Sequence, residues 1–278
     1  MRTLRLLVRH PTGRLGLVLL ALLVLAAVFA PVLAPYDPLI QNHGDELVPP
    51  LRTMTYPLGT DELGRDMASR LLWATRTAFL VGAIAVSAGV TTGVLCGLLA
   101  GYFGGWVDSV IMRLFDVLIT FPNLLLAIAI VSAVGPGQLN VAYSLAVALV
   151  PGTARLLRGQ VLAQRERDYV LAAQAIGAQD ARIMFRHILP NSIAPLVVTV
   201  FLALGFSVLA DAGLSFLGLG TQPPHPSWGA MLNASRAYLR DAWWYGFGAM
   251  ACLATFMLAL NSISDALRDV LDPRHLGR

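Results

Sequence analysis

The chain alternates between long apolar stretches and shorter polar ones. Six stretches are apolar over roughly the 20 residues that a helix needs to cross a bilayer. They are Leu15–Ala34, Thr77–Gly101, Met112–Val134, Leu139–Leu157, Ile193–Leu214 and Trp243–Ser264. The pattern predicts an all-α integral membrane protein with six transmembrane helices. The first stretch exceeds the apolar core of about 7–15 residues in a secretory signal, so we expect an uncleaved span.

Composition supports a membrane protein and excludes several other classes. Of the 278 residues, 56% are hydrophobic and 13% are charged, and the mean hydropathy is +0.68. A soluble domain carries about twice that share of charge. The net charge of +4 comes from arginines at the ends of the apolar stretches rather than on one basic face, so we expect lipid contact and no nucleic acid.

The distribution of arginine predicts the orientation. Fourteen of the 20 basic residues lie on the same side as the two termini, and six lie on the other side. An excess of arginine marks the cytoplasmic side, so both termini are expected in the cytoplasm. The six on the outer side are Arg52, Arg65, Arg70, Arg76, Arg236 and Arg240.

Two divisions of the chain follow from this topology. Residues 1–76 are expected to form an N-terminal segment, the first span and an outer loop. Residues 77–278 are expected to form a five-helix core that carries a cytoplasmic loop at 165–191. Within the second stretch, Gly89, Gly93 and Gly97 recur every four residues, which predicts a face for close helix packing rather than a substrate contact.

The cytoplasmic loop, "RDYVLAAQAIGAQDARIMFRHILPN" from Arg167 to Asn191, is too charged to cross a bilayer but has helical periodicity. Apolar residues recur at i, i+3, i+4 and i+7 from Tyr169 to Ile176, which predicts one helical face. Gly177 should end this first helix, and Pro190 should close a second one. The pair could lie on the inner leaflet or dock in a groove of a cytoplasmic protein. The small Ala172 and Ala173 favour docking.

The alanine pair, the glycine and the later Leu-Pro of this loop resemble the EAA loop of binding-protein-dependent ABC importer permeases. Leu171 stands where that family has the glutamate that names the loop. In the family this loop forms coupling helices that contact an ATPase subunit. The resemblance therefore implies an ATPase-coupling role for Tyr169, Leu171, Ala172, Ala173, Ile176, Gly177, Arg182, Phe185, Arg186, Leu189 and Pro190.

Four further stretches resemble the "C" permease of dipeptide, oligopeptide and nickel importers. They are Pro57–Gly82, Gly101–Ala127, Asp211–Leu232 and Asp265–Arg274. The resemblance implies a bacterial or archaeal inner-membrane subunit that forms half of a pathway with a second, homologous permease. It also implies two ATP-binding subunits that carry ATP and Mg²⁺, and an extracytoplasmic substrate-binding protein. Di- or oligopeptides are the first substrate expected, with nickel as the alternative.

In "GTDELGRD", the pattern predicts a turn capped by Asp61, with Glu62 in the first turn of an interfacial helix. Arg65, Asp66 and Arg70 would then lie on the solvated polar face of this helix. The alternative is a contact with the substrate-binding protein, which would use Asp61, Glu62, Arg65 and Asp66.

Asp211 lies at the outer end of the fifth stretch, where an ionisable group is costly unless it is paired or hydrated. Its side chain could reach the bilayer surface, or it could line a translocation path or outer gate with Ser215 and Phe216. Two other acidic residues near inner helix ends should pair with neighbouring arginines. These expected pairs are Asp116 with Arg113 and Asp265 with Arg268.

We find no sequence pattern for catalysis by this chain. It contains no lysine, so it cannot form a phosphate-binding loop of the GxxxxGK[ST] type, and we expect ATP hydrolysis on separate subunits. Cys96 and Cys252 lie in apolar runs, and His225 is isolated in a proline-rich loop, so we expect no metal site. An ATP-independent secondary transporter is the alternative of another class, but no internal repeat supports it.

Overall fold

The computed structural model describes residues 6–8 and 10–271. The arginines at positions 2, 5, 9, 274 and 278, which contributed to the predicted orientation, lie outside these residues. Within this part of the chain the regular elements are helices, with one isolated bridge between Thr60 and Asp66. The α-helices are α2 (Pro11–Val28), α3 (Ala30–Leu33), α4 (Met67–Phe103), α5 (Gly105–Ile119), α6 (Asn123–Val134), α7 (Gln138–Arg165), α8 (Asp168–Ala175), α9 (Asp180–Arg182), α10 (Leu189–Phe216), α11 (Trp228–Ser235) and α12 (Trp243–Leu271).

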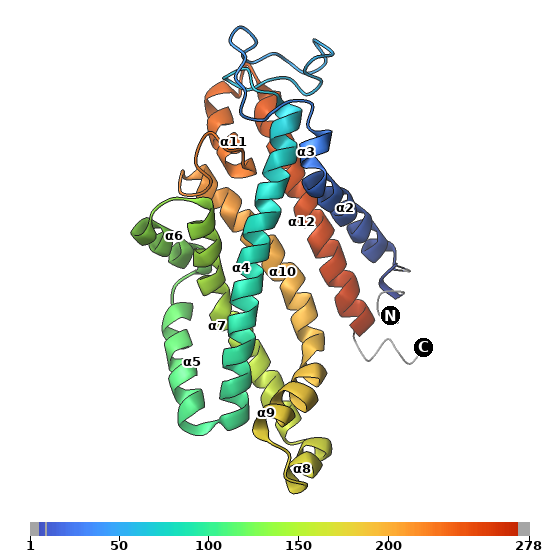
Figure 1. Cartoon of the computed structure of the whole chain (residues 1–278), viewed down its shortest axis with the longest axis vertical. Coiled ribbons are helices and arrows are strands. Elements are labelled where there is room, and N and C mark those ends of the chain that lie inside the picture. Colours follow the sequence, from blue (N-terminus) through green and yellow to red (C-terminus); the bar gives the residue numbers. More distant parts are fainter. Residues whose placement is uncertain (1–5, 9, 272–278) are drawn as a thin grey trace.

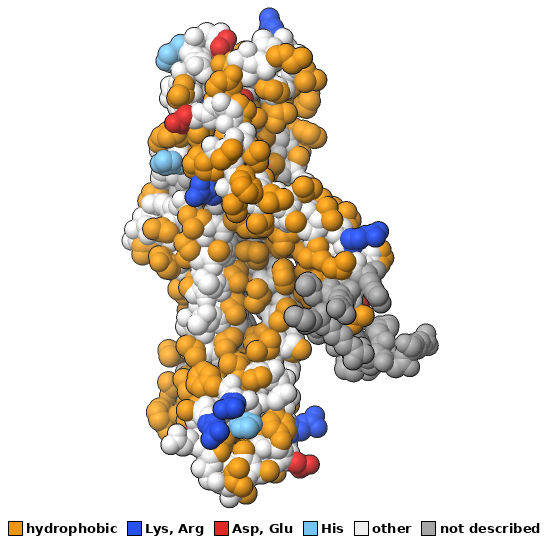
Figure 2. Space-filling view, turned by 45° about the vertical axis from the view of Figure 1, so that its right-hand side comes forward, with side chains coloured by type: hydrophobic (Ala, Val, Ile, Leu, Met, Phe, Trp, Pro, Cys, Tyr) orange, Lys and Arg blue, Asp and Glu red, His pale blue; other side chains and the backbone are white. Residues whose placement is uncertain are grey.

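The long helices form an elongated bundle along α4 (Figure 1). The α2 and α12 helices run together on one side of α4, and α5 and α6 lie on the other side. One end of the bundle carries α8 and α9, and we call it the α8 end. The opposite end carries α3, α11 and the long loop before α4, and we call it the α11 end. On the face shown in Figure 2, charged side chains gather toward the two ends, and hydrophobic side chains cover much of the middle.

Among the described residues, five helical segments are long and apolar enough to cross a membrane. They are α2, α4, α7, the continuous segment Asp180–Phe216 that contains α9 and α10, and α12. The expectation of a continuous span over Met112–Val134 is wrong. This stretch is divided between α5 and α6, which meet at an angle of 89°. The break falls at Pro122, because proline has no N–H to donate and disfavours helical geometry in the residue before it. The bent pair can count as a sixth span.

Close packing of α4 against α7 confirms the prediction from the glycine row. A Cβ added at Gly89 would lie 2.7 Å from the carbonyl oxygen of Ala146, and one at Gly97 would lie 2.4 Å from that of Ala154. Neither separation is possible between real atoms, so only glycine allows the two backbones to approach this closely. Gly101 continues the row against Val161.

The predicted division at residue 76 falls inside α4, which begins at Met67. The N-terminal span also packs directly on the last one, since a Cβ at Gly16 in α2 would lie 2.7 Å from the carbonyl oxygen of Ala259 in α12. The first helix is therefore part of one continuous bundle.

Two acidic residues were expected to pair with nearby arginines, and one pair is confirmed. Arg268 lies 3.8 Å from Asp265, as predicted. Asp116 pairs with Arg155 rather than with Arg113. Arg155 lies on α7, and its partner lies on α5, so this exposed pair connects the two helices instead of linking neighbours within one turn.

Candidate functional site at the alpha8 end

The first helix of the predicted loop ends at the expected glycine. Gly177 has φ of +76°, the left-handed conformation that glycine adopts without steric cost. Its N–H donates to the carbonyl oxygen of Gln174, and the N–H of Ala178 donates to that of Ala173. These two hydrogen bonds form a Schellman cap, which satisfies carbonyl groups at the helix end. A Cβ added at position 177 would meet nothing within 4 Å among the described residues beyond its immediate neighbours.

The apolar face of α8 differs in part from the prediction. Val170 and Ala173 are buried against the bundle. Tyr169, Ala172 and Ile176 share a face at spacings of three and four residues, but all three are exposed, and Ile176 is 85% exposed. We call these three residues the α8 outer face. Together they form a small exposed apolar surface on α8.

The second helix of the loop does not end at Pro190. A π-helical turn over Ile183–Ile188 leads directly into α10, and the N–H of Leu189 donates to the carbonyl oxygen of Met184, five residues earlier. Pro190 is the second residue of α10 and directly follows the π-helical turn, so it lies inside this helical segment rather than at its end. As a result, the loop and the fifth span form one continuous helical rod.

The loop is fixed to the rest of the bundle through Tyr102 at the end of α4. The Tyr102 hydroxyl donates to Asp180 Oδ1 at 2.6 Å, and Arg165 Nη1 donates to the Tyr102 carbonyl at 3.0 Å. Beneath them, Ile183 and Ile188 are fully buried in a cluster with residues of α4 and α7. A force applied to α8 would therefore reach α4, α7 and α10 together.

The remaining residues of the predicted coupling set surround this anchored helix. Leu171 and Phe185 are each about half exposed, Leu189 is half-buried, and Arg182, Arg186 and Pro190 are exposed. Leu171 lines a hollow of about 470 Å³ together with Tyr102, Arg165 and Asp180. Whether these residues contact an ATPase stays a prediction.

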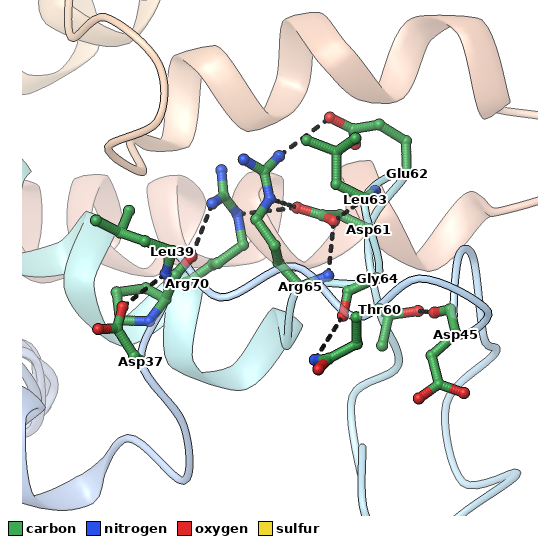
Figure 3. A network of polar contacts seen from close by, with 12 residues as sticks. Asp37, Leu39, Asp45, Thr60, Asp61, Glu62, Leu63, Gly64, Arg65 and Arg70 are labelled. Atoms are coloured by element: carbon green, nitrogen blue, oxygen red, sulfur yellow. Dashed lines mark hydrogen bonds and ion pairs between the residues drawn. The ribbon is translucent and has the colours of Figure 1, made fainter.

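The sequence "GTDELGRD" forms a buried charge network at the α11 end (Figure 3). The Asp61 carboxylate is completely buried, and it accepts a hydrogen bond from Arg65 Nε at 2.6 Å. Arg70 Nε lies 3.1 Å from the same Asp61 oxygen, and Arg70 Nη1 donates to the Pro38 carbonyl. Arg65 also pairs with Glu62 at 3.1 Å. One carboxylate thus holds together two arginines, one of which also binds the loop before α4 at Pro38.

The predicted interfacial helix at this place is wrong. The residues before Met67 form a loop, and α4 is capped by Asp66, whose Oδ2 accepts from the N–H of Ser69 at 2.7 Å. Asp61 instead accepts from the backbone N–H groups of Leu63 and Arg65. The polar face is not solvated either, because only Glu62 of the four predicted residues has a partly exposed side chain. A binding-protein contact here stays a prediction.

Asp211 lies in the last two turns of α10 and is only 3% exposed. The interpretation that its side chain reaches the bilayer surface is therefore wrong. The Ser215 hydroxyl is 3.5 Å from Asp211 Oδ1, and it accepts from the Thr221 N–H at 3.4 Å. The Phe216 ring lies 5.2 Å from the Arg236 guanidinium. A role for Asp211, Ser215 and Phe216 in a translocation path stays a prediction.

Comparison with known proteins identifies the class of this helical bundle. Residues 93–276 match the family described as "Binding-protein-dependent transport system inner membrane component". Residues 1–50 match the "N-terminal TM domain of oligopeptide transport permease C". The chain belongs to the family of binding-protein-dependent ABC importer permeases and is a multi-pass membrane protein.

Two relatives and one solved structure illustrate the similarity. The "Di/tripeptide transport system permease protein DppC" of Pseudomonas aeruginosa is 43% identical over 270 residues, which cover 95% of this chain and 89% of that protein. The "Glutathione transport system permease protein GsiD" of Shigella flexneri is 46% identical over 258 residues, which cover 92% and 84%. A solved inward-facing conformation of the MetNI methionine ABC transporter has a TM-score of 0.54 at 18% identity, covering 73% of this chain and 94% of that one, and it supports the fold.

Proposed function

We propose that this chain forms half of the transmembrane pathway of an ATP-driven importer for short peptides. The observation that carries the proposal is the α8 outer face: an exposed apolar helix face, rigidly anchored to three long helices, in a chain of this permease family. Two ATP-binding subunits, which carry ATP and Mg²⁺, would dock on this face. Closure of the two ATP-binding subunits onto each other would move α8, and α10 would transmit this movement to the other long helices.

The proposal includes a second homologous permease and an extracytoplasmic substrate-binding protein. It places the α8 end and both termini in the cytoplasm, since most arginines lie on that side. The α11 end would then face the binding protein. The chain itself would perform no catalysis, because ATP hydrolysis belongs to the separate subunits.

Di- and tripeptides are the proposed substrates, because two relatives that are 43% and 40% identical, over 95% and 93% of this chain, carry such names. Glutathione, itself a tripeptide, is a second candidate that the 46% identical relative supports. Uptake of labelled dipeptide, glutathione and nickel by the reconstituted importer would separate these substrates. Nickel uptake without peptide uptake would contradict the proposed substrate class.

We expect Ile176→Asp to abolish co-purification of the ATP-binding subunits. The side chain is 85% exposed, so the change should leave the chain folded, while a carboxylate placed in an apolar groove of the partner would lose its hydration. The measurement is a pull-down of the subunits with tagged wild-type and variant chains. Ile40→Asp is the matched control, because Ile40 is also exposed but lies in the loop at the α11 end. Equal recovery with both variants would contradict docking on α8.

A further inference from the structure

A single arginine stands at the edge of an apolar groove between α2 and α4. The groove has a volume of about 490 Å³ and is lined by Val24, Ala27, Val28, Arg76, Phe79 and Leu80. Ala27 is buried and forms part of the floor, together with Phe79, which stacks edge-on against Phe256 of the core. Val28 and Leu80 are 62% and 49% exposed and form the rims. Nothing in the described chain fills this space.

The arginine has no acidic partner within the described residues. Arg76 is exposed. Its guanidinium carbon lies 5.5 Å from the centroid of the Trp73 ring, in a cation–π contact. The neighbouring Arg65 and Arg70, by contrast, both pair with Asp61. A guanidinium is more weakly hydrated than an ammonium group, and it can donate two parallel hydrogen bonds to one phosphate or carboxylate.

The position along the helices indicates the depth of the site. Val28 is the last residue of α2, so the groove lies at the α11 end of that span. Trp73 lies one turn nearer to the same end of α4, and tryptophan collects at the level of lipid headgroups. An arginine at this level can direct its guanidinium toward the headgroups while its stem covers apolar surface.

We propose that this groove binds a phospholipid, with its phosphate on Arg76 and an acyl chain along Val24, Val28 and Leu80. Two features match this ligand: a cation without an acidic partner among the described residues, suited to the phosphodiester, and an open, mainly apolar groove directly beside it for the chain. The site needs only that the chain is inserted in a membrane. The leaflet, which is the outer one in the orientation proposed above, rests on the proposed function.

The test is to titrate the purified, delipidated full chain with phosphatidylglycerol and to count bound lipid by native mass spectrometry. Arg76→Gln should weaken binding about fivefold, the effect of one basic residue near a headgroup. Val28→Trp, which fills the groove and keeps the cation, should weaken it as well. Arg240→Gln is the control, because it removes another exposed arginine that does not line this groove, and this variant should bind the lipid as tightly as the wild type.

Several results would overturn the proposal. One is an equal effect of Arg76→Gln and Arg240→Gln. Another is equal binding of diacylglycerol, which has the chains but no phosphate, and a third is binding of inorganic phosphate that matches the lipid in strength. Release of the lipid when the complete importer assembles would show that the second permease covers the groove. Loss of peptide uptake with lipid binding intact would affect the proposed function alone.

Discussion

Gly97→Ala is expected to destabilise the protein more than any other alanine substitution of a helical glycine facing α7. The added methyl carbon would lie 2.4 Å from the carbonyl oxygen of Ala154 and about 3.1 Å from the carbon atoms beside it. A backbone oxygen cannot rotate away, so α4 and α7 must separate. Overpacking costs about 1–3 kcal/mol, and we expect the upper end of this range or more. The measurement is the melting temperature of the detergent-solubilised chain, which should fall by roughly 5–10 °C.

Gly152→Ala provides the matched control. Gly152 is also a helical glycine, on α7, but a Cβ added there would meet nothing within 4 Å. This variant should melt at or slightly above the wild-type temperature, because alanine is the better helix former. Equal melting temperatures for the two variants would contradict the close approach of α4 and α7.

Asp61→Asn is expected to unfold the loop at the α11 end. The substitution leaves Arg65 and Arg70, each with a side chain only 6% exposed, without the carboxylate that both contact. Arg65 keeps its pair with Glu62, but Arg70 has no other acidic partner among the described residues, and a buried charge left unpaired typically costs about 3–5 kcal/mol. Limited proteolysis of the loop before α4 should become faster, and the melting temperature of the solubilised chain should fall.

Asp116→Asn is the control for this second variant. Asp116 also pairs with an arginine, but both side chains are more than half exposed. An exposed pair contributes about 0–1 kcal/mol, so this variant should resist protease as the wild type does. Rapid cleavage of both variants, or of neither, would show that burial does not set the strength of the Asp61 network.

Most of the fold could be predicted from local sequence patterns. The apolar stretches mark the long helices, since each needs only its own length and composition to be recognised. The glycine row indicated a packing face, because repeated glycines at one face serve little else in a membrane helix. The left-handed Gly177 was also predictable, because a Schellman cap depends on a few adjacent residues.

The errors arose where a distant partner decides the structure. Nothing near Asp61 in the sequence shows that Arg70, in the second turn of α4, will bury against it, so the motif was interpreted as a solvated helix. The bond from Tyr102 to Asp180 spans 78 positions and has no local pattern. Pro190 was taken as a helix end, because the preceding π turn that accommodates it depends on burial of Ile183 and Ile188.

Coupling through α8 is the central claim, and the ratio of peptide transported to ATP hydrolysed tests it most directly. The importer is reconstituted in proteoliposomes with Gly177→Val or with Gly177→Asn. Valine is strained at φ of +76°, at a cost of about 1–2 kcal/mol, whereas asparagine tolerates this conformation. A Cβ added at this position would have no described atom of this chain within 4 Å, beyond its immediate neighbours. We predict that valine lowers the ratio severalfold while ATP hydrolysis continues, and that asparagine preserves it. An unchanged ratio in the valine variant would contradict coupling through α8.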